Sequence, residues 1–275
     1  MGLRINTNVP SLAAQRAITQ NSRQTDRAMR QLATGSRFAD ITEGAGDFAI
    51  SENLRGQVKG MEAAKNNAEN AISFVQVAEG GLNEQNNLLI RMRELSVQAA
   101  SDTYSDTERE MMSHEFNQLK EEVDRIAKTT SYGSQKLLNG STKEYEFQVG
   151  AYKGSDNVVT YTSDTNSTAS ELGVDSLDVA DKSAAQDSLE SIDTALVSIG
   201  KARSTYGAVQ SRFDHIVNYQ SEQIVNLEDA RSKIADTDFA KAYSEVTRGM
   251  ALQQYQMAML NVANQFPGNV LKLIA

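Results

Sequence analysis

Few residue patterns in this chain of 275 residues could carry catalysis or bind a metal. The segment from His114 to Gln118 resembles the helical zinc site of metalloproteases, which needs a second histidine four residues after the first. Position 118 is a glutamine, so the second imidazole ligand is missing. The chain also contains no cysteine, which removes thiolate ligands, nucleophilic thiols and disulfides from consideration. We therefore predict no metal site.

Two other segments resemble functional motifs, and for both a structural role is favoured. Residues 44–49, Gly-Ala-Gly-Asp-Phe-Ala, resemble a dinucleotide-binding turn, but no strand precedes them and no βαβ unit surrounds them. We interpret this segment as a joint between helices. His215 has no nucleophile-bearing turn near it and is expected at the surface or partly covered. The sequence thus predicts no catalytic residue and no cofactor.

The composition narrows the class of protein. A net charge of -9 argues against nucleic acid or an anionic membrane as partner. The longest apolar run, residues 257–260, is too short to span a bilayer, so membrane insertion is not expected. Residues 1–10 lack the apolar core of a cleavable signal peptide. We therefore expect a cytosolic protein, or one exported without a cleaved signal.

Each end of the chain carries a seven-residue apolar repeat, which is typical of a coiled coil. The C-terminal repeat consists of Phe239, Tyr243, Val246, Met250, Met257 and Leu260. The N-terminal repeat consists of Ala14, Ile18, Ala28 and Leu32, with Asn21 and Thr25 in its middle positions. Because those two polar residues leave little apolar area to offset the ordering entropy, the N-terminal helix is expected to fold only against partners. Both repeats are therefore predicted to form an assembly interface.

Longer helices are predicted between these ends, since the two prolines, Pro10 and Pro267, lie near the termini. A first apolar repeat runs from Met61 to Ala99 and is interrupted at Gln85 and Ser96. The break at residues 101–107 contains Asp106, which we predict to cap the next helix.

The remaining middle of the chain changes character and then returns to helix. Residues 129–179 are rich in Gly, Ser, Thr, Asn and Asp and contain short alternating pieces, which predicts hairpins and loops. A long repeat resumes from Leu189 to Ile234. Segments 43–101 and 180–234 have matched lengths of roughly 80 to 90 Å at 1.5 Å per residue, which favours an antiparallel helical rod.

Five segments together resemble bacterial flagellins, in the order and spacing of that family. They are 4–8 (Arg-Ile-Asn-Thr-Asn), 32–37 (Leu-Ala-Thr-Gly-Ser-Arg), 79–84 (Glu-Gly-Gly-Leu-Asn-Glu), 91–95 (Arg-Met-Arg-Glu-Leu) and 264–271 (Asn-Gln-Phe-Pro-Gly-Asn-Val-Leu). The resemblance covers essentially the whole chain. It implies a mainly α fold, a long antiparallel helical rod with terminal coiled-coil helices and a short β-hairpin and loop region. The implied domains are a terminal helical domain, residues 1–42 plus 236–275, that forms a filament's inner tube, and a rod domain, residues 43–235, with the β and loop region at 129–179.

The resemblance also implies a function. It indicates a secreted, extracellular structural subunit, not an enzyme, that polymerises with itself into the bacterial flagellar filament for motility. Implied transient partners are a flagellar secretion chaperone, a filament cap and a hook-associated adaptor. A host Toll-like receptor is a further implied partner, and the matching positions are Arg91, Leu95 and Glu115.

Three alternatives remain open at the level of sequence. A hook–filament junction protein would share the architecture, although the segments at 91–95 and 264–271 favour the filament subunit. A flagellin-type enzyme with a protease insert would need the complete zinc motif. A cytosolic helical signalling adaptor would be favoured if the protein never left the cell.

Overall fold

The computed structural model describes residues 7–38, 40, 44–141 and 143–274, with the backbone alone at 266, 267 and 269–274. The chain forms two compact units, which we call the terminal unit (residues 1–58 with 225–275) and the central unit (residues 59–224). The mainly helical fold predicted from the sequence is confirmed. Of the predicted domain boundaries, residue 42 lies outside the described residues, and residue 236 falls between two helices of the terminal unit.

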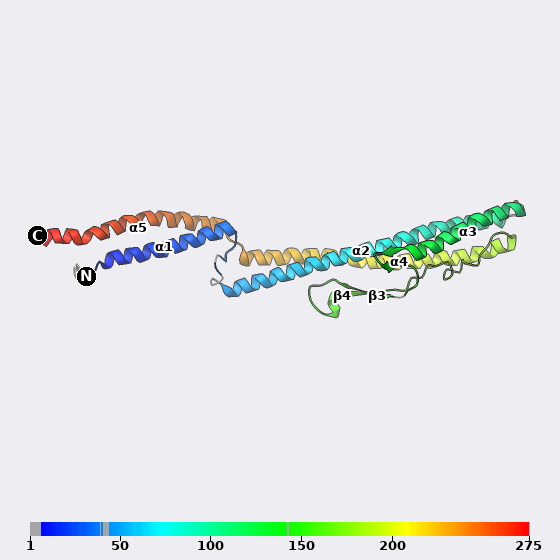
Figure 1. Cartoon of the computed structure of the whole chain (residues 1–275), viewed down its shortest axis with the longest axis horizontal. Coiled ribbons are helices and arrows are strands. Elements are labelled where there is room, and N and C mark those ends of the chain that lie inside the picture. The colour runs from blue at the N-terminus through cyan, green and yellow to red at the C-terminus, as the bar shows by residue number, and fades with distance from the viewer. Residues whose placement is uncertain (1–6, 39, 41–43, 142, 275) are drawn as a thin grey trace. The chain divides into compact units, whose positions relative to one another are not determined.

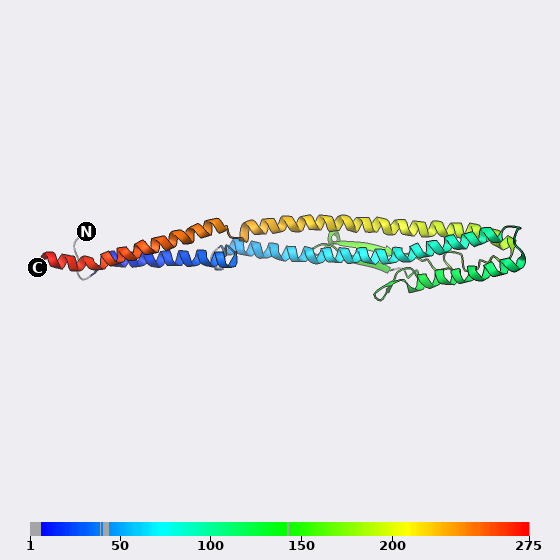
Figure 2. The ribbon, with the colours of Figure 1, turned by 90° about the horizontal axis from the view of Figure 1, so that it is seen from above.

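The terminal unit pairs the two ends of the chain. Helix α1 (Val9–Thr34) and helix α5 (Phe239–Ile274) lie side by side and run in opposite directions (Figures 1 and 2). The Asn8 side chain caps α1 by accepting a hydrogen bond from Ser11 N. At the other end Gly35 adopts the left-handed conformation, with φ 68°, that commonly ends a helix. Asp238 caps α5 by accepting a hydrogen bond from Lys241 N at 3.1 Å.

The segments that leave α1 and enter α5 are bonded to each other. Arg37 N donates to Ala235 O at 2.7 Å, and Thr237 N donates to Gly35 O at 2.9 Å. Ser36 and Asp236 form an antiparallel bridge between these bonds. The chain is therefore pinned by backbone hydrogen bonds where its first and last helices meet.

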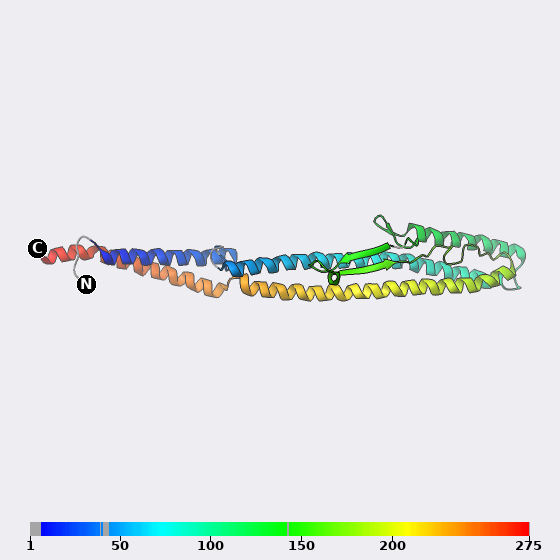
Figure 3. The same cartoon turned by 90° about the horizontal axis from the view of Figure 1, so that it is seen from below.

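The central unit is built on two long helices. Helix α2 (Ala45–Ala99) runs into this unit from the terminal unit, and helix α4 (Lys182–Ala235) runs back alongside it. Helix α3 (Asp106–Thr129) lies beside α2 (Figure 3), and residues of all three helices share one core. Most predicted apolar positions of α2 are buried, as the repeat indicated. Gln85 and Ser96, which the sequence presented as interruptions, are also fully buried. The buried face of α2 is therefore unbroken, although two of its residues are polar.

Helix α3 begins one residue earlier than predicted. Ser105, not Asp106, is the N-cap: its hydroxyl accepts from Glu108 N, and the Glu108 carboxylate accepts from Ser105 N at 2.7 Å. This reciprocal capping box satisfies two backbone donors, whereas Asp106 occupies the first turn, where its charge favours the helix dipole.

The predicted hairpins are confirmed. Strands β1 (Ser131–Tyr132) and β2 (Gln135–Lys136) form a short pair. Strands β3 (Lys143–Gln148) and β4 (Val158–Ser163) form an antiparallel pair in register from Lys143 with Ser163 to Gln148 with Val158, and the short 3-10 turn η1 (Ser155–Asn157) lies in their connection. Aromatic contacts attach β3 to the long helices, with Phe74 of α2 and Tyr145 at 4.8 Å and Phe147 and Phe213 of α4 at 5.3 Å between ring centroids.

Candidate assembly surfaces

Helix α1 presents one continuous face to α5, which we call the α1 seam. It consists of Ser11, Ala14, Ile18, Asn21, Thr25, Ala28 and Leu32, all buried or half-buried. The structure therefore places the predicted N-terminal repeat against α5. Asn21 and Thr25, which the sequence presented as weak points, are 7% and 8% exposed and make defined polar contacts. Asn21 Nδ2 donates to Gly249 O at 2.8 Å.

The face of α5 that meets α1 differs from the predicted repeat. This α5 seam consists of Ala242, Val246, Gly249, Gln256, Leu260 and Ala263. Only Val246 and Leu260 belong to both sets. The cause is that α5 is apolar around much of its circumference, so spacings of three and four residues fit more than one stripe.

Two apolar stripes of α5 remain exposed on either side of its seam. The first flank consists of Phe239, Tyr243, Met250 and Met257, which are 47 to 68% exposed. The second flank consists of Leu252, Tyr255, Met259 and Val262, which are 45 to 73% exposed. The sequence reasoning missed the second flank, although its spacing of three and four residues was visible. Exposed apolar area of this extent on one helix indicates contact with other molecules.

The charge distribution of α5 agrees with burial in an assembly. No charged residue occurs between Arg248 and Lys272. Charged side chains are depleted in the core of protein interfaces because removing an unpaired charge from water is costly. Even so, no helix in the described part of the chain is long and apolar enough to cross a membrane.

The predicted receptor positions lie where α2 passes α3. Arg91 Nε donates to Glu115 Oε1 at 2.9 Å, and Arg91 also contacts Glu94 at 3.0 Å. The hydrogen bond to Glu115 is the main cause that raises the pKa of Arg91. Both partners of this ion pair are accessible. Leu95, in contrast, is 1% exposed and packs in the core of the central unit, so it offers no contact surface in this structure.

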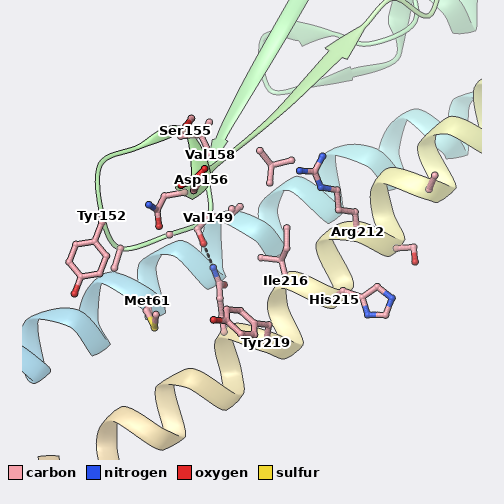
Figure 4. A pocket seen from close by; sticks show the side chains of 17 residues that line it. Met61, Val149, Tyr152, Ser155, Asp156, Val158, Arg212, His215, Ile216 and Tyr219 are labelled. Atoms are coloured by element: carbon pink, nitrogen blue, oxygen red, sulfur yellow. Dashed lines mark hydrogen bonds between the residues drawn. The ribbon is translucent and has the colours of Figure 1, made fainter.

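A cleft of about 1010 Å³ opens between the loop that joins β3 to β4 and helix α4 (Figure 4). Met61, Val149 and Ile216 line it, and the exposed rings of Tyr152 and Tyr219 lie at its edge. Gln220 Nε2 donates to Val149 O and holds the loop onto α4. His215 points away from the loop and is exposed, as predicted.

The zinc-protease pattern considered for residues 114–118 does not form a metal site in this structure. His114 and Gln118 are both exposed on α3. Among the described residues, no group of three or more His, Cys, Asp or Glu side chains is placed to hold a metal ion.

Comparison with known proteins finds relatives that match nearly the whole chain. Residues 5–143 match the model of the bacterial flagellin N-terminal helical region, and residues 189–274 match that of the bacterial flagellin C-terminal helical region. The flagellin of Halalkalibacterium halodurans is 37% identical over 98% of this chain and 99% of its own length. The Bacillus subtilis flagellin is 35% identical over 99% of this chain and 100% of its own length. A flagellar filament 30.7 kDa core protein of Treponema maltophilum is 34% identical over 98% of this chain and 99% of its own length.

Solved structures show the same fold. The crystal structure of Bacillus cereus flagellin is similar with a TM-score of 0.50 and 28% identity, over 56% of this chain and 88% of that one. The structure of a putative flagellar hook-associated protein from Vibrio parahaemolyticus is similar with a TM-score of 0.60 and 16% identity, over 70% of this chain and 100% of that one. At this identity the similarity concerns the fold alone.

Proposed function

The chain belongs to the bacterial flagellin family and is a structural subunit of the flagellar filament, and from this premise we propose that the two flanks of α5 are its main assembly surfaces. The observation that supports the proposal is the exposure of eight large apolar side chains on a helix whose third apolar stripe already contacts α1. Each such side chain contributes about 1.5 to 3 kcal/mol when it is fully buried.

Two flanks on opposite sides of one seam suit two different neighbours. A subunit in a helical polymer meets its neighbours through unlike surfaces, since a head-to-tail contact that does not close generates a filament. In this proposal the first flank contacts one neighbouring subunit and the second flank contacts another, while the α1 seam covers the third side. The predicted interface residues Ala14, Ile18, Ala28 and Leu32 then act within the subunit, and Phe239, Tyr243, Met250 and Met257 act between subunits.

The terminal helical domain predicted from the sequence, residues 1–42 with 236–275, accordingly forms the inner tube of the filament. The uncharged stretch from Gly249 to Leu271 supports this placement, because the tube encloses α5 more completely than any other helix. Residues 43–235 form the rod domain that contacts neighbours outside the tube. Matches to full-length flagellins favour this role over that of the hook–filament junction protein.

The proposal extends to the transient partners. Before assembly the flanks of α5 are an aggregation hazard, so a secretion chaperone covers them. A filament cap and a hook-associated adaptor contact the subunits at the two ends of the polymer. Toward a host Toll-like receptor, the accessible Arg91 and Glu115 provide the contact, and buried Leu95 holds α2 beneath them.

Replacement of Met250 and Met257 together with Asp tests the role of the first flank. Both side chains are exposed in the monomer, so its helical content and unfolding should not change. Assembly should be lost, because two carboxylates would be buried without partners. Sedimentation and electron microscopy measure filament formation, and circular dichroism measures helicity.

A matched control is Met111→Asp, which makes the same chemical change at an exposed methionine of α3. That chain should still form filaments. Normal filaments from M250D/M257D would show that the first flank is not an interface, and the proposal would be abandoned.

A further inference from the structure

We propose that Asn21, Thr25 and Gly249 form a register lock that sets the axial alignment of α1 against α5. The contacts of this lock lie within one chain. Only its effect on assembly rests on the proposed function. Asn21 Nδ2 donates to Gly249 O at 2.8 Å, a bond that is buried between the helices. Thr25 Oγ1 donates to Asn21 O at 2.9 Å, which places the threonine one turn further along, also buried.

The close approach at this point depends on the absence of a side chain at position 249. A Cβ atom added to Gly249 would lie 2.1 Å from Thr25 Oγ1 and 3.2 Å from Thr25 Cβ. Such a contact is far inside van der Waals distance and falls on a buried side chain, so the helices or Thr25 would have to shift. Gly249 is the one glycine of the α5 seam as defined above, so no other seam position can accept Thr25.

The apolar part of the two seams cannot specify alignment by itself. Both helices keep a seven-residue spacing, but polar residues occupy its middle positions, Asn21 and Thr25 on α1 and Gln256 on α5. The apolar residues between them are few and mostly small, so they specify the alignment only weakly. A buried polar contact removes this freedom, and a single buried Asn is the best-attested device for fixing coiled-coil register. After a one-heptad slip Asn21 would face Ala242 or Gln256 in place of Gly249.

The lock positions the assembly surfaces. Helix α1 also exposes apolar side chains, Val9, Leu12 and Met29, and a neighbouring subunit that touches both helices needs them at one height relative to the flanks of α5. A slip of seven residues moves α1 by about 10 Å along α5. That displacement exceeds the length of a side chain, so slipped chains should be rejected by the growing filament. Asn21, Thr25 and Gly249 are thus positioning residues for polymerisation.

The absence of cysteine permits a direct measurement. Cysteines at the exposed positions Gln20 and Gln254 carry spin labels, and doubly labelled chains are diluted into an excess of unlabelled chain and assembled onto filament seeds. The dilution ensures that the measured distance lies within one chain. The lock-intact chain should give a single label-to-label distance.

Asn21→Leu removes the hydrogen bond and keeps the seam apolar. This labelled chain should either show a second, displaced distance or be incorporated several-fold less than its matched control Gln24→Leu, an exposed change on α1. Full incorporation of N21L with the single original distance would overturn the proposal. That outcome would not affect the proposed role of the α5 flanks, which M250D/M257D tests separately.

Gly249→Ala tests the close approach separately. Incorporation should be lost, while Gly56→Ala, at a helical glycine with open space around it, should be incorporated normally. Adding Thr25→Ala to G249A removes the clashing hydroxyl and should restore most of the incorporation. Failure of T25A to rescue G249A would show that contact with Thr25 is not what requires glycine, and the lock would be rejected.

Discussion

Gln85 shows how much one buried polar side chain can do in this fold. It lies in α2 with no exposed surface, and its Nε2 donates to Val123 O of α3 at 2.8 Å and to Ser167 O of the loop after β4 at 3.0 Å. Its Oε1 has no hydrogen-bond partner among the described residues. One amide group therefore joins three segments that the sequence separates widely.

We predict that Gln85→Leu lowers the free energy of unfolding by about 2 to 4 kcal/mol, because two buried carbonyls lose a donor that water cannot replace. Urea unfolding followed by circular dichroism measures the change. Gln76→Leu, at an exposed position of the same helix, serves as control and should stay within about 0.5 kcal/mol of the original. Equal stability of Q85L and Q76L would mean that other donors reach these carbonyls.

The burial of polar residues on the helix faces could not be predicted from the apolar repeat. The apolar repeat correctly located the faces of α1, α2 and α4, but it counted Gln85, Ser96, Asn21 and Thr25 as interruptions. Each of the four is buried. Their burial depends on carbonyls supplied by their own helix or by distant segments, as Met92 O is for Ser96 and Gly249 O is for Asn21. A periodicity of apolar residues carries no information about such partners.

At the scale of elements, the helices and the main hairpin could be predicted, whereas their mutual rotation could not. Strong periodicity and the position of the two prolines determined the helices. For α5 the choice of buried face depends on where the partner backbone can approach, which Gly249 decides and which the apolar pattern does not reveal. The α3 cap was misplaced by one residue because serine and aspartate are nearly equal as N-caps, and only the return bond from Glu108 distinguishes them.

Asp178 joins two elements, α3 and the segment that enters α4. Its Oδ1 accepts hydrogen bonds from Ser113 Oγ at 2.6 Å, Val179 N at 2.7 Å and Ala180 N at 3.2 Å. The bond from Ser113 is the main cause that lowers the pKa of Asp178 below its ordinary value of 3.8, and the backbone bonds add to it. A group whose pKa is lower in the folded than in the unfolded state stabilises the fold when ionised.

The stability that Asp178 contributes should therefore be present above pH 3.8 and lost as the pH falls through its folded-state pKa. We expect Asp178→Asn to be less stable than the original chain at neutral pH, with a difference that shrinks as the solution becomes more acid. Urea unfolding at a series of pH values measures it, with the exposed neighbour Asp175→Asn as control. A difference that does not change with pH would show that the ionised carboxylate is not the stabilising form.

At the scale of the whole molecule the two units differ in how they are stabilised. The largest fully buried side chains, among them Tyr206, Phe116 and Phe213, all belong to the central unit. The α1 and α5 seams bury mostly small or polar residues instead, and α5 leaves its flanks exposed. Regions with few buried apolar contacts open most readily, so the terminal unit should open first in a free subunit.

Limited proteolysis should reveal this difference. In dilute monomer trypsin should cut first in α1 and α5, at residues such as Arg16, Arg23 and Arg248, and should spare residues 59–224 although these also contain many Lys and Arg. In filaments the cuts in α1 and α5 should disappear, because neighbouring subunits cover both helices. Mass spectrometry of the fragments locates the cuts. Equal protection of both units in the monomer would show that the terminal unit folds fully without assembly.

The pairing of the chain's two ends has a consequence for which molecules can enter the polymer. Asn8 donates to Ala263 O and Asn21 to Gly249 O, across 255 and 228 positions of sequence. Helix α1 therefore has no partner until almost all of the chain has been synthesised and delivered. A chain cut short before α5 keeps the residues of the central unit but leaves α1 without its partner helix and lacks both flanks. We therefore expect the contact between first and last helix to act as a check on completeness that keeps such fragments out of the filament.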